Sequence, residues 1–151
     1  MIATQKPSKY KNKKVNYDGH KFDSQAECDY YIMLRESEKI KTVQDIIVHP
    51  KYELQPKFKK GGKTHRPVIY EADFEVGVIS DSGEVETVVI DIKGLPTESA
   101  KIKRKLFNFK YRTTKLLWIA WSKIDGGWIE YDQLIKNRKK RKSDKGGCEI
   151  L

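Results

Sequence analysis

The chain has 151 residues and a formal net charge of +10, from 31 Lys and Arg against 21 Asp and Glu. This length suits one domain with a single core. No apolar run approaches the roughly 18 residues of a membrane span, so we expect a soluble cytoplasmic protein with no membrane partner. The positive charge favours a polyanionic partner, nucleic acid first, while a basic surface that serves only solubility is the open alternative.

Basic residues concentrate at the two ends of the chain. We predict a basic, loosely ordered N-terminal segment over residues 1–14, a single domain over residues 15–136 and a basic tail over residues 137–151. Cys28 and Cys148 lie far apart in the sequence, without a metal-ligand spacing, and fit a reducing cytoplasm better than a disulfide.

The domain is predicted to begin with a hairpin and a helix. Residues 15–22 predict two short strands with Asp18 and Gly19 at the turn. Ser24 is a favourable N-cap for a helix over residues 24–40, and Glu27 completes a capping-box pattern three residues later. Helix capping and a role in chemistry are therefore both open for Glu27.

The middle of the chain is predicted to be extended. Residues 46–50 predict a turn into an extended segment over residues 52–58, in which Pro56 indicates an edge or an end. Residues 59–63 predict a loop. Two strands over residues 67–79 and 84–93, joined by a hairpin loop over residues 80–83, then predict an antiparallel pair. The apolar run over residues 88–90 is typical of a central strand covered on both faces.

The last third of the chain alternates helix and strand again. We predict a helix from Thr97 to about Tyr111, a strand over residues 115–121, a short strand over residues 128–130 and a helix over residues 131–139. The order is thus helix, three strands, helix and one or two strands, which predicts an α/β fold.

Asp91 and Lys93 lie two residues apart on the predicted central strand, so their side chains should point from the same face. Mg²⁺ prefers a few carboxylates with several retained waters. We predict that Asp73 and Asp91 bind such an ion and that Glu27 reaches it from the first helix, through water. Lys93 would orient or deprotonate an attacking water and offset phosphate charge.

The order of these residues resembles the pattern of the PD-(D/E)XK nuclease superfamily: a helix-borne Glu, an Asp on one strand, and an acid with Lys on the next. Glu27, Asp73, Asp91 and Lys93 match this pattern one by one, while Ala72 stands where the superfamily's name has Pro. The chain also resembles a small phage-associated branch of the superfamily, catalogued as domain of unknown function 1064. The segments that carry this second likeness are Tyr10–Lys14, Tyr17–Gly19, Phe22–Ser24, Leu54–Pro56, Ala72–Phe74 and Asp91–Gly94.

The resemblance implies a restriction-endonuclease-like αβββαβ core with a central mixed sheet flanked by helices. It implies that residues 15–136 form the domain of an endodeoxyribonuclease that uses Mg²⁺, with Mn²⁺ as a substitute. Archaeal Holliday-junction resolvases of the superfamily have a similar size and charge, which points to branched DNA as the substrate and to a homodimer. A protein encoded by a phage or prophage would act in the cytoplasm of the bacterial host.

The resemblance also indicates roles for residues outside the quartet. Gln55 would contact metal-bound water or phosphate, and Lys101 and Lys105 would contact phosphate, with ordinary surface positions as their alternatives. Glu71 shares a predicted strand face with Asp73, and the match over residues 72–74 favours Asp73. The further predicted DNA contacts are Lys9, Lys11, Lys13, Lys14, Lys103, Arg104, Arg138, Lys139, Lys140 and Arg141.

Two other residue types have simpler predictions. His20, His49 and His65 lack a common spacing, so we predict loop or surface positions and no zinc site. Core or interface positions are predicted for Trp118, Trp121 and Trp128, with stacking on an unpaired base as the alternative.

Two alternatives to a nuclease stay open. One is a phage regulatory protein that keeps the fold and binds DNA without cleaving it. The other is a protein-binding accessory factor whose charge serves solubility alone.

Overall fold

The computed structural model describes residues 13–146 of the chain. Among the residues predicted above, Lys9, Lys11 and Cys148 lie outside this range. The elements in chain order are β1 (Val15–Tyr17), β2 (His20–Phe22), α1 (Gln25–Lys39), β3 (Val43–Val48), β4 (Lys51–Gln55), β5 (Phe58–Lys60), β6 (Lys63–His65), β7 (Val68–Glu71), β8 (Phe74–Ile79), β9 (Val85–Ile92), α2 (Glu98–Lys110), β10 (Lys115–Ser122), β11 (Gly127–Glu130) and α3 (Tyr131–Gly146). None of the three described helices is both long and apolar enough to cross a membrane.

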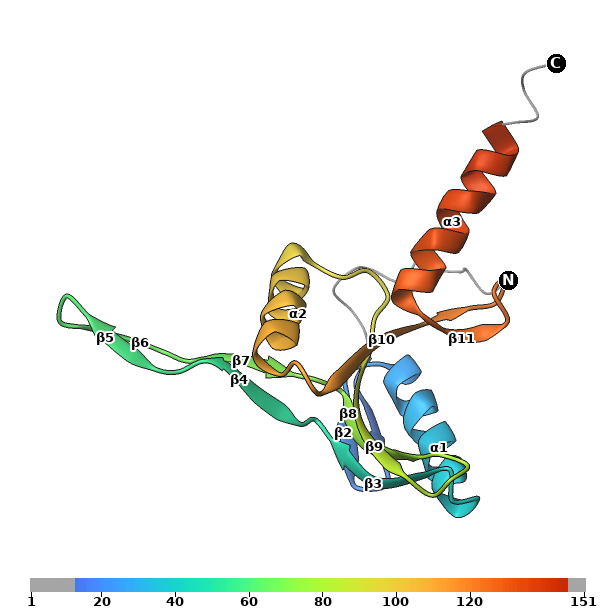
Figure 1. Cartoon of the computed structure of the whole chain (residues 1–151), viewed down its shortest axis with the longest axis horizontal. Helices are drawn as coiled ribbons and strands as arrows, with labels where there is room; N and C mark the ends of the chain where they lie inside the picture. The colour runs from blue at the N-terminus through green and yellow to red at the C-terminus, as the bar shows by residue number, and fades with distance from the viewer. Residues whose placement is uncertain (1–12, 147–151) are drawn as a thin grey trace.

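A five-stranded sheet in the order β11-β10-β9-β8-β3 forms the centre of the fold (Figure 1). β9 and β10 run parallel, and the other neighbouring strands run antiparallel. Three of the seven strands between α1 and α2 belong to this sheet, β3, β8 and β9. β8 and β9 lie within the strands predicted over residues 67–79 and 84–93, whereas β3 was not predicted and the strand predicted over residues 52–58 lies outside the sheet. The predicted α/β fold with a central mixed sheet flanked by helices is thereby confirmed.

Helices α1 and α2 cover opposite faces of the sheet. Val88 and Ile90 of β9 belong to one buried cluster with Tyr31 of α1. Val89, which lies between them in sequence, belongs to a second cluster with Phe107 of α2. Successive side chains of a strand point to opposite faces, so the predicted central strand covered on both faces is confirmed.

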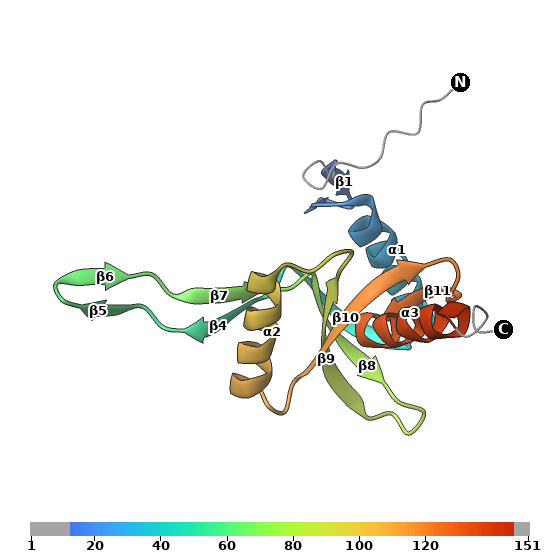
Figure 2. The same cartoon turned by 90° about the horizontal axis from the view of Figure 1, so that it is seen from above.

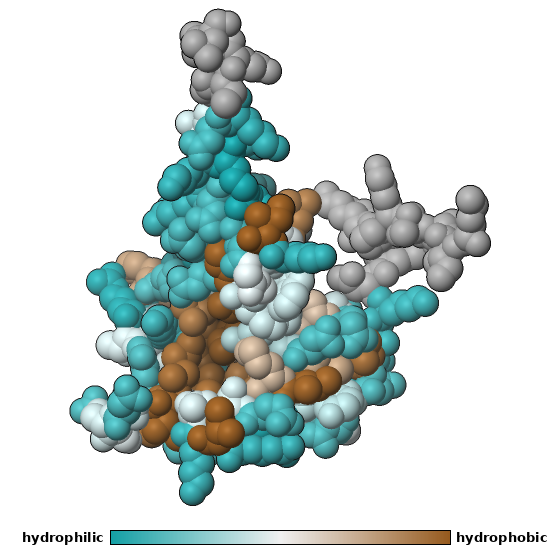
Figure 3. Space-filling view, turned by 90° about the vertical axis from the view of Figure 1, so that its right-hand side faces the viewer, coloured by the Kyte–Doolittle hydropathy of each residue, from teal (hydrophilic) through white to brown (hydrophobic). Residues whose placement is uncertain are grey.

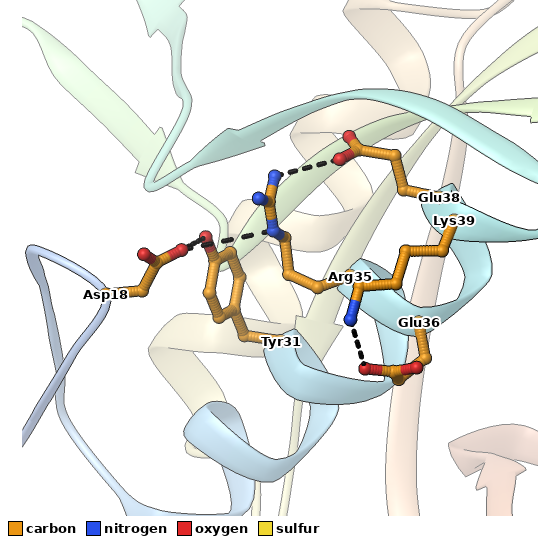
Figure 4. Close-up of polar contacts among 6 residues, drawn as sticks. All are labelled: Asp18, Tyr31, Arg35, Glu36, Glu38 and Lys39. Carbon is orange, nitrogen blue, oxygen red and sulfur yellow. Dashed lines mark hydrogen bonds and ion pairs between the residues drawn. The ribbon is translucent and has the colours of Figure 1, made fainter.

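Polar contacts tie the β1–β2 turn to α1 (Figure 4). The Tyr31 hydroxyl donates a hydrogen bond of 2.7 Å to Asp18 Oδ2 in the turn. Arg35 Nε lies 3.9 Å from the same carboxylate oxygen, and Arg35 Nη1 pairs with Glu38 at 2.8 Å. The predicted hairpin is confirmed, and its contacts help to fix the helix that carries Glu27.

The predicted turn at residues 46–50 is wrong, because most of this segment belongs to strand β3. β3 pairs with β8, and its register shifts between Gln44 and Ile47. Asp45 at this irregularity has a φ of 52°. An extra residue in a strand breaks the alternation of buried and exposed positions, and for this reason the sequence pattern did not reveal the strand.

The single strand predicted over residues 67–79 is interrupted at Ala72 and Asp73, which separate β7 from β8. The Ala72 N–H donates to Pro50 O at 3.0 Å, and the Asp73 N–H donates to Ile90 O at 3.1 Å. The chain thus changes its pairing partner at this point, from the β4 side to β9.

Strands β4 to β7 form a two-stranded extension that leaves the domain, and we call its residues 51–71 the hairpin arm (Figures 1 and 2). β4 pairs with β7 near the sheet, and β5 pairs with β6 at the tip. β4 ends before Pro56, as predicted. The loop predicted over residues 59–63 is reduced to Gly61 and Gly62, whose φ values of 58° and 74° permit a tight hairpin turn.

Helix α3 extends past the predicted end at residue 139 to Gly146. Leu134 is its buried residue, and hydrophilic side chains cover the helix at the top of Figure 3, above a band of apolar side chains. The described part of the predicted basic tail therefore continues α3.

Candidate functional site

Three side chains from distant parts of the sequence meet beside the sheet: Glu27 in the first turn of α1, His49 after β3, and Asp73 between β7 and β8. One ligand atom of each lies within 4.8 Å of the other two. The His49 N–H donates to Asp73 O at 2.9 Å and joins two of the three segments. Two carboxylates and an imidazole at this spacing could bind a metal ion.

Glu27 lies in the capped first turn of α1 and also belongs to the cluster of potential metal ligands. Ser24 Oγ accepts a hydrogen bond of 3.2 Å from the Glu27 N–H, and Glu27 Oε2 accepts one of 3.1 Å from the Asp23 N–H. Helix capping does not exclude metal binding, because a carboxylate has two oxygens with several lone pairs. Burial raises the pKa of the Glu27 carboxyl above its usual value.

Asp73 is the most strongly perturbed acid of the cluster. Its Oδ2 accepts a hydrogen bond of 2.6 Å from the Ile92 N–H, which fixes the side chain against the end of β9. Burial raises the pKa of Asp73 well above its usual range, and the negative charges of Asp91 and Glu27 raise it further. A bound cation would offset this accumulation of negative charge.

Asp91 and Lys93 lie together at the end of β9, which confirms that their side chains share one face. Lys93 Nζ is 3.1 Å from Asp91 Oδ2. The Tyr70 hydroxyl donates to the same oxygen at 2.5 Å, and Trp118 Nε1 donates to the Tyr70 hydroxyl at 2.9 Å. This chain of contacts holds the buried Asp91 carboxylate in one orientation. Burial of the phenol raises the pKa of Tyr70, and the negative charge of Asp91 raises it further.

Lys93 lines two cavities. The first has a volume of about 490 Å³ and lies between the base of the hairpin arm, the end of β9 and the start of α2, lined in part by Lys51, Tyr70, Glu71, Asp91, Thr97 and Lys103. The second, of about 330 Å³, is lined in part by Glu27, Gly94, Trp121 and Arg138. An extended anionic ligand that spanned both cavities would pass over Lys93.

The alternative acid, Glu71, lies at the edge of this site. Its side chain is half-exposed and points to Lys51, with 3.9 Å between the carboxylate and the ammonium. Glu71 lines the first cavity but is not part of the cluster of potential metal ligands among the described residues.

The supporting residues predicted from the sequence, Gln55, Lys101 and Lys105, are not among the residues that line the two cavities. Gln55 is exposed at the end of β4, opposite Val68 in the hairpin arm. Lys101 pairs with Glu98 at 3.0 Å, and Lys105 is exposed on α2.

The predicted DNA contacts fall into three groups. Lys103 and Arg138 line the first and second cavities. Arg104 and Arg141 form hydrogen-bonded ion pairs within the protein, with Asp132 and Asp125 respectively. The remaining described contacts are exposed to solvent: Lys13, Lys14, Lys139 and Lys140.

The tryptophans take different positions. Trp118 is buried beside Tyr70, as predicted for a core residue, and the Arg104 guanidinium lies 4.4 Å from its ring centroid. Trp121 is 60% exposed at the second cavity and packs edge-on against Trp128 at 5.1 Å.

His49 is a potential ligand that the sequence prediction placed in a loop or at the surface. Its Nε2 is buried, and no described group forms a hydrogen bond with it. Its φ of 55° is uncommon for a residue other than glycine, and such strain concentrates at functional sites. Its position after Ile46-Ile47-Val48 was the one available signal, and the neighbouring Pro50 gave it the appearance of an ordinary turn.

A His49→Asn variant is expected to bind Mn²⁺ at least about tenfold more weakly, a loss on the scale seen when metal-site contacts are removed. Asn adopts positive φ more readily than most residues, so the fold should survive. Mg²⁺, which is bound through oxygens, should be affected less. Isothermal titration with each ion measures this effect, and His65→Asn in the hairpin arm is the control. Unchanged Mn²⁺ affinity would remove His49 from the site.

Comparison with known proteins places the chain in a family. The comparison with the curated proteins found no match, and neither did the comparison with the solved structures. The model of one family, described as protein of unknown function (DUF1064), matches residues 7–125, which is most of the chain. The protein therefore belongs to the DUF1064 family.

Proposed function

We propose that the protein is a metal-dependent endodeoxyribonuclease of the PD-(D/E)XK type, which hydrolyses DNA phosphodiester bonds with Mg²⁺ as its cofactor and Mn²⁺ as a substitute. One observation supports this proposal above all. Of the residues selected by their order in the sequence, Asp73 lies close enough to Asp91 and Glu27 for their charges to raise its pKa, and Lys93 pairs with Asp91. Asp91 and Lys93 line the first cavity, and Glu27 and Lys93 line the second. Clusters of perturbed acids in a cleft are typical of active sites.

The chemistry of phosphodiester hydrolysis fits these residues. A divalent cation supplies stabilisation of the charge that develops on the phosphate and its leaving oxygen. Asp73, Glu27 and His49 have the donor atoms to hold this cation. Asp91, also predicted as a ligand, is not part of this cluster among the described residues, but its charge acts on the adjacent Asp73. Carboxylates suit Mg²⁺ and Mn²⁺, and the imidazole adds a nitrogen donor better suited to transition metals.

The role proposed for Lys93 is to hold the attacking water. Its side chain is 23% exposed, and its ammonium is 3.1 Å from Asp91, so it reaches the cavity while it stays anchored. From there Lys93 would hold the water and place a positive charge against the phosphate. Tyr70 and Trp118 act through Asp91, by fixing the orientation of its carboxylate.

DNA is the proposed substrate because basic side chains line both cavities together with the acids. Lys51 and Lys103 line the first cavity, and Arg138 lines the second. Lys and Arg contacts to phosphates supply most of the sequence-independent affinity for DNA and make it depend on salt. A phosphate held between these cations would lie beside Lys93.

Branched DNA, such as a Holliday junction formed in phage recombination or replication, is the specific substrate proposed. It rests on the resemblance to junction resolvases of the superfamily. Symmetric resolution of a junction needs two active sites, which implies a two-fold homodimer. The expected place of action is the cytoplasm of the bacterial host of the phage or prophage.

The test compares a synthetic four-way junction with a linear duplex of matched sequence, each with Mg²⁺ and with a chelator. Paired symmetric nicks in the junction that require Mg²⁺ are expected. Equal cleavage of both substrates would keep the nuclease and discard the junction. Tight binding without cleavage would favour the DNA-binding regulatory protein, and the absence of both would overturn the proposal.

A further inference from the structure

The base of the hairpin arm is fixed to the domain. The ring of Tyr52 in β4 packs edge-on against Phe107 of α2, with 5.1 Å between ring centroids. The main-chain oxygen of Glu53 accepts hydrogen bonds from Lys110 Nζ at 2.7 Å and from the Tyr111 hydroxyl at 2.8 Å. The direction in which the arm leaves the domain is therefore set by its contacts with α2.

The outer part of the hairpin arm is exposed and strongly basic. Between Leu54 and Tyr70 the sequence has no acidic residue and five cationic ones, Lys57, Lys59, Lys60, Lys63 and Arg66. All five are exposed, and none forms an ion pair with a described acidic side chain. An uncompensated positive charge of this density costs stability through self-repulsion, so a role in the stability of the domain does not explain it.

The tip of the arm nevertheless has a defined structure. Phe58 and His65 are opposite each other in the β5–β6 pair, and their rings stack with 4.5 Å between centroids and 8° between planes. Cross-strand aromatic pairs stabilise hairpins. Pro56 and Pro67 lie where the pairing of β4 with β7 gives way to that of β5 with β6. The chain thus maintains a separate basic ribbon outside the core.

The dimensions of the arm match those of duplex DNA. The major groove, about 12 Å wide, admits a two-stranded β-ribbon. At about 3.3 Å per residue, the ten steps along the chain from Lys51 to Gly61 span at most roughly 33 Å, which is close to one helical turn of B-DNA. Lys51 and Glu71 at the base of the arm line the same cavity as Asp91 and Lys93. The arm thus begins at the candidate catalytic site.

We propose that the hairpin arm is a second DNA-binding element, which lies in a groove of the duplex and contacts phosphates up to about one helical turn from the scissile bond. This inference rests on the proposed function. Pairing between the arms of two protein copies is disfavoured, because it would bring two sets of five cations together. The charge of the tip and the position of the base instead fit one continuous DNA-binding surface, which runs from the tip of the arm to the candidate site.

The test removes charge from the arm and leaves its backbone intact. An arm variant carries Lys57→Gln, Lys59→Gln, Lys60→Gln and Lys63→Gln. Its control loses the same charge at exposed lysines outside the arm and the site: Lys21→Gln, Lys39→Gln, Lys115→Gln and Lys123→Gln. Affinity for a linear duplex is measured against salt concentration with Asp91→Asn in each background, and footprints are recorded for each complex.

Log affinity falls as log salt rises, and in the arm variant we expect the magnitude of this slope to be smaller by about 2 to 4, because each phosphate contact contributes about 0.9. Its footprint should be shorter on one side of the site, and its cleavage rate at saturating DNA should match that of wild type. If wild type cleaves DNA but the arm variant has the same salt slope and footprint as the control variant, the proposed role of the hairpin arm is overturned and the proposed function is retained. Dissociation of the arm variant into monomers before DNA is added would also overturn the proposed role, because the arm would then hold two protein copies together. If wild type neither binds nor cleaves DNA, the proposed function fails as well.

Discussion

An Asp91→Asn variant is expected to cleave DNA more slowly by a factor on the order of a thousand, the scale on which one electrostatic group acts in an active site. Asn keeps the shape of the side chain and still accepts the hydrogen bond from Tyr70, so the fold should be retained. The substitution removes the negative charge beside Asp73 and leaves Lys93 without its partner at 3.1 Å. DNA binding should persist, because Asp91 is buried and the surface cations are unchanged.

Single-turnover cleavage and fluorescence anisotropy separate these two effects. Glu71→Gln is the matched control, because Glu71 lines the same cavity as Asp91 but is half-exposed and lies near Lys51 instead of Lys93. We expect the control to cleave at close to the wild-type rate. Full activity of Asp91→Asn would exclude the proposed catalytic site.

Asp73→Asn is expected to stabilise the metal-free protein at neutral pH and to abolish its stabilisation by Mn²⁺. Burial and the charges of Asp91 and Glu27 raise the folded-state pKa of Asp73 above the unfolded value near 3.8. Between these two pKa values the folded state binds more protons than the unfolded state, so stability falls as pH rises. The slope for such a group is at most about 1.4 kcal/mol per pH unit. Asn does not titrate, and its carbonyl can still accept from the Ile92 N–H.

Urea unfolding in chelator at pH 5 and at pH 8 measures this difference. From pH 5 to pH 8, the free energy of unfolding of the variant should rise relative to that of wild type by on the order of 1 kcal/mol or more. With Mn²⁺ added, wild type should be stabilised as expected for a ligand that binds only the folded state, whereas the variant should not respond. An identical pH dependence of the two proteins would mean that Asp73 is not held among like charges.

Asp125→Asn is a control in which the same Asp-to-Asn change is expected to alter stability at neutral pH in the opposite direction. The hydrogen bonds from Arg141, Ser122 and Asn137 hold the pKa of Asp125 below its usual value. This group therefore stabilises the fold above its unfolded pKa, and the contribution is lost as pH falls. The same chemical change should thus lower stability at neutral pH instead of raising it.

Local patterns in the sequence account for the parts of the site that belong to one element. The spacing of Asp91 and Lys93 predicted a shared strand face, because side chains alternate along a strand. Ser24 predicted the start of α1, because its side chain caps an N–H that the helix leaves free. Both interactions join residues close together in the chain, and both were visible without a structure.

The sequence did not reveal where those elements meet. His49 belongs to the site because the irregular pairing of β3 with β8 carries it to Asp73. Asp73 occupies its position because the predicted strand over residues 67–79 is interrupted between β7 and β8. The alternating pattern that predicts strands is lost at bulges and breaks, and these two irregularities build the cluster.

By itself, the sequence determined the α/β class, the basic character of the protein and the acid–lysine pair, since each follows from composition or from short-range periodicity. Only the tertiary structure decided that a histidine joins two carboxylates, and that a presumed loop is the tip of a hairpin arm whose base borders the site. Those features depend on contacts between residues far apart in the chain. Such contacts follow from the pairing and packing of whole elements, which no local pattern encodes.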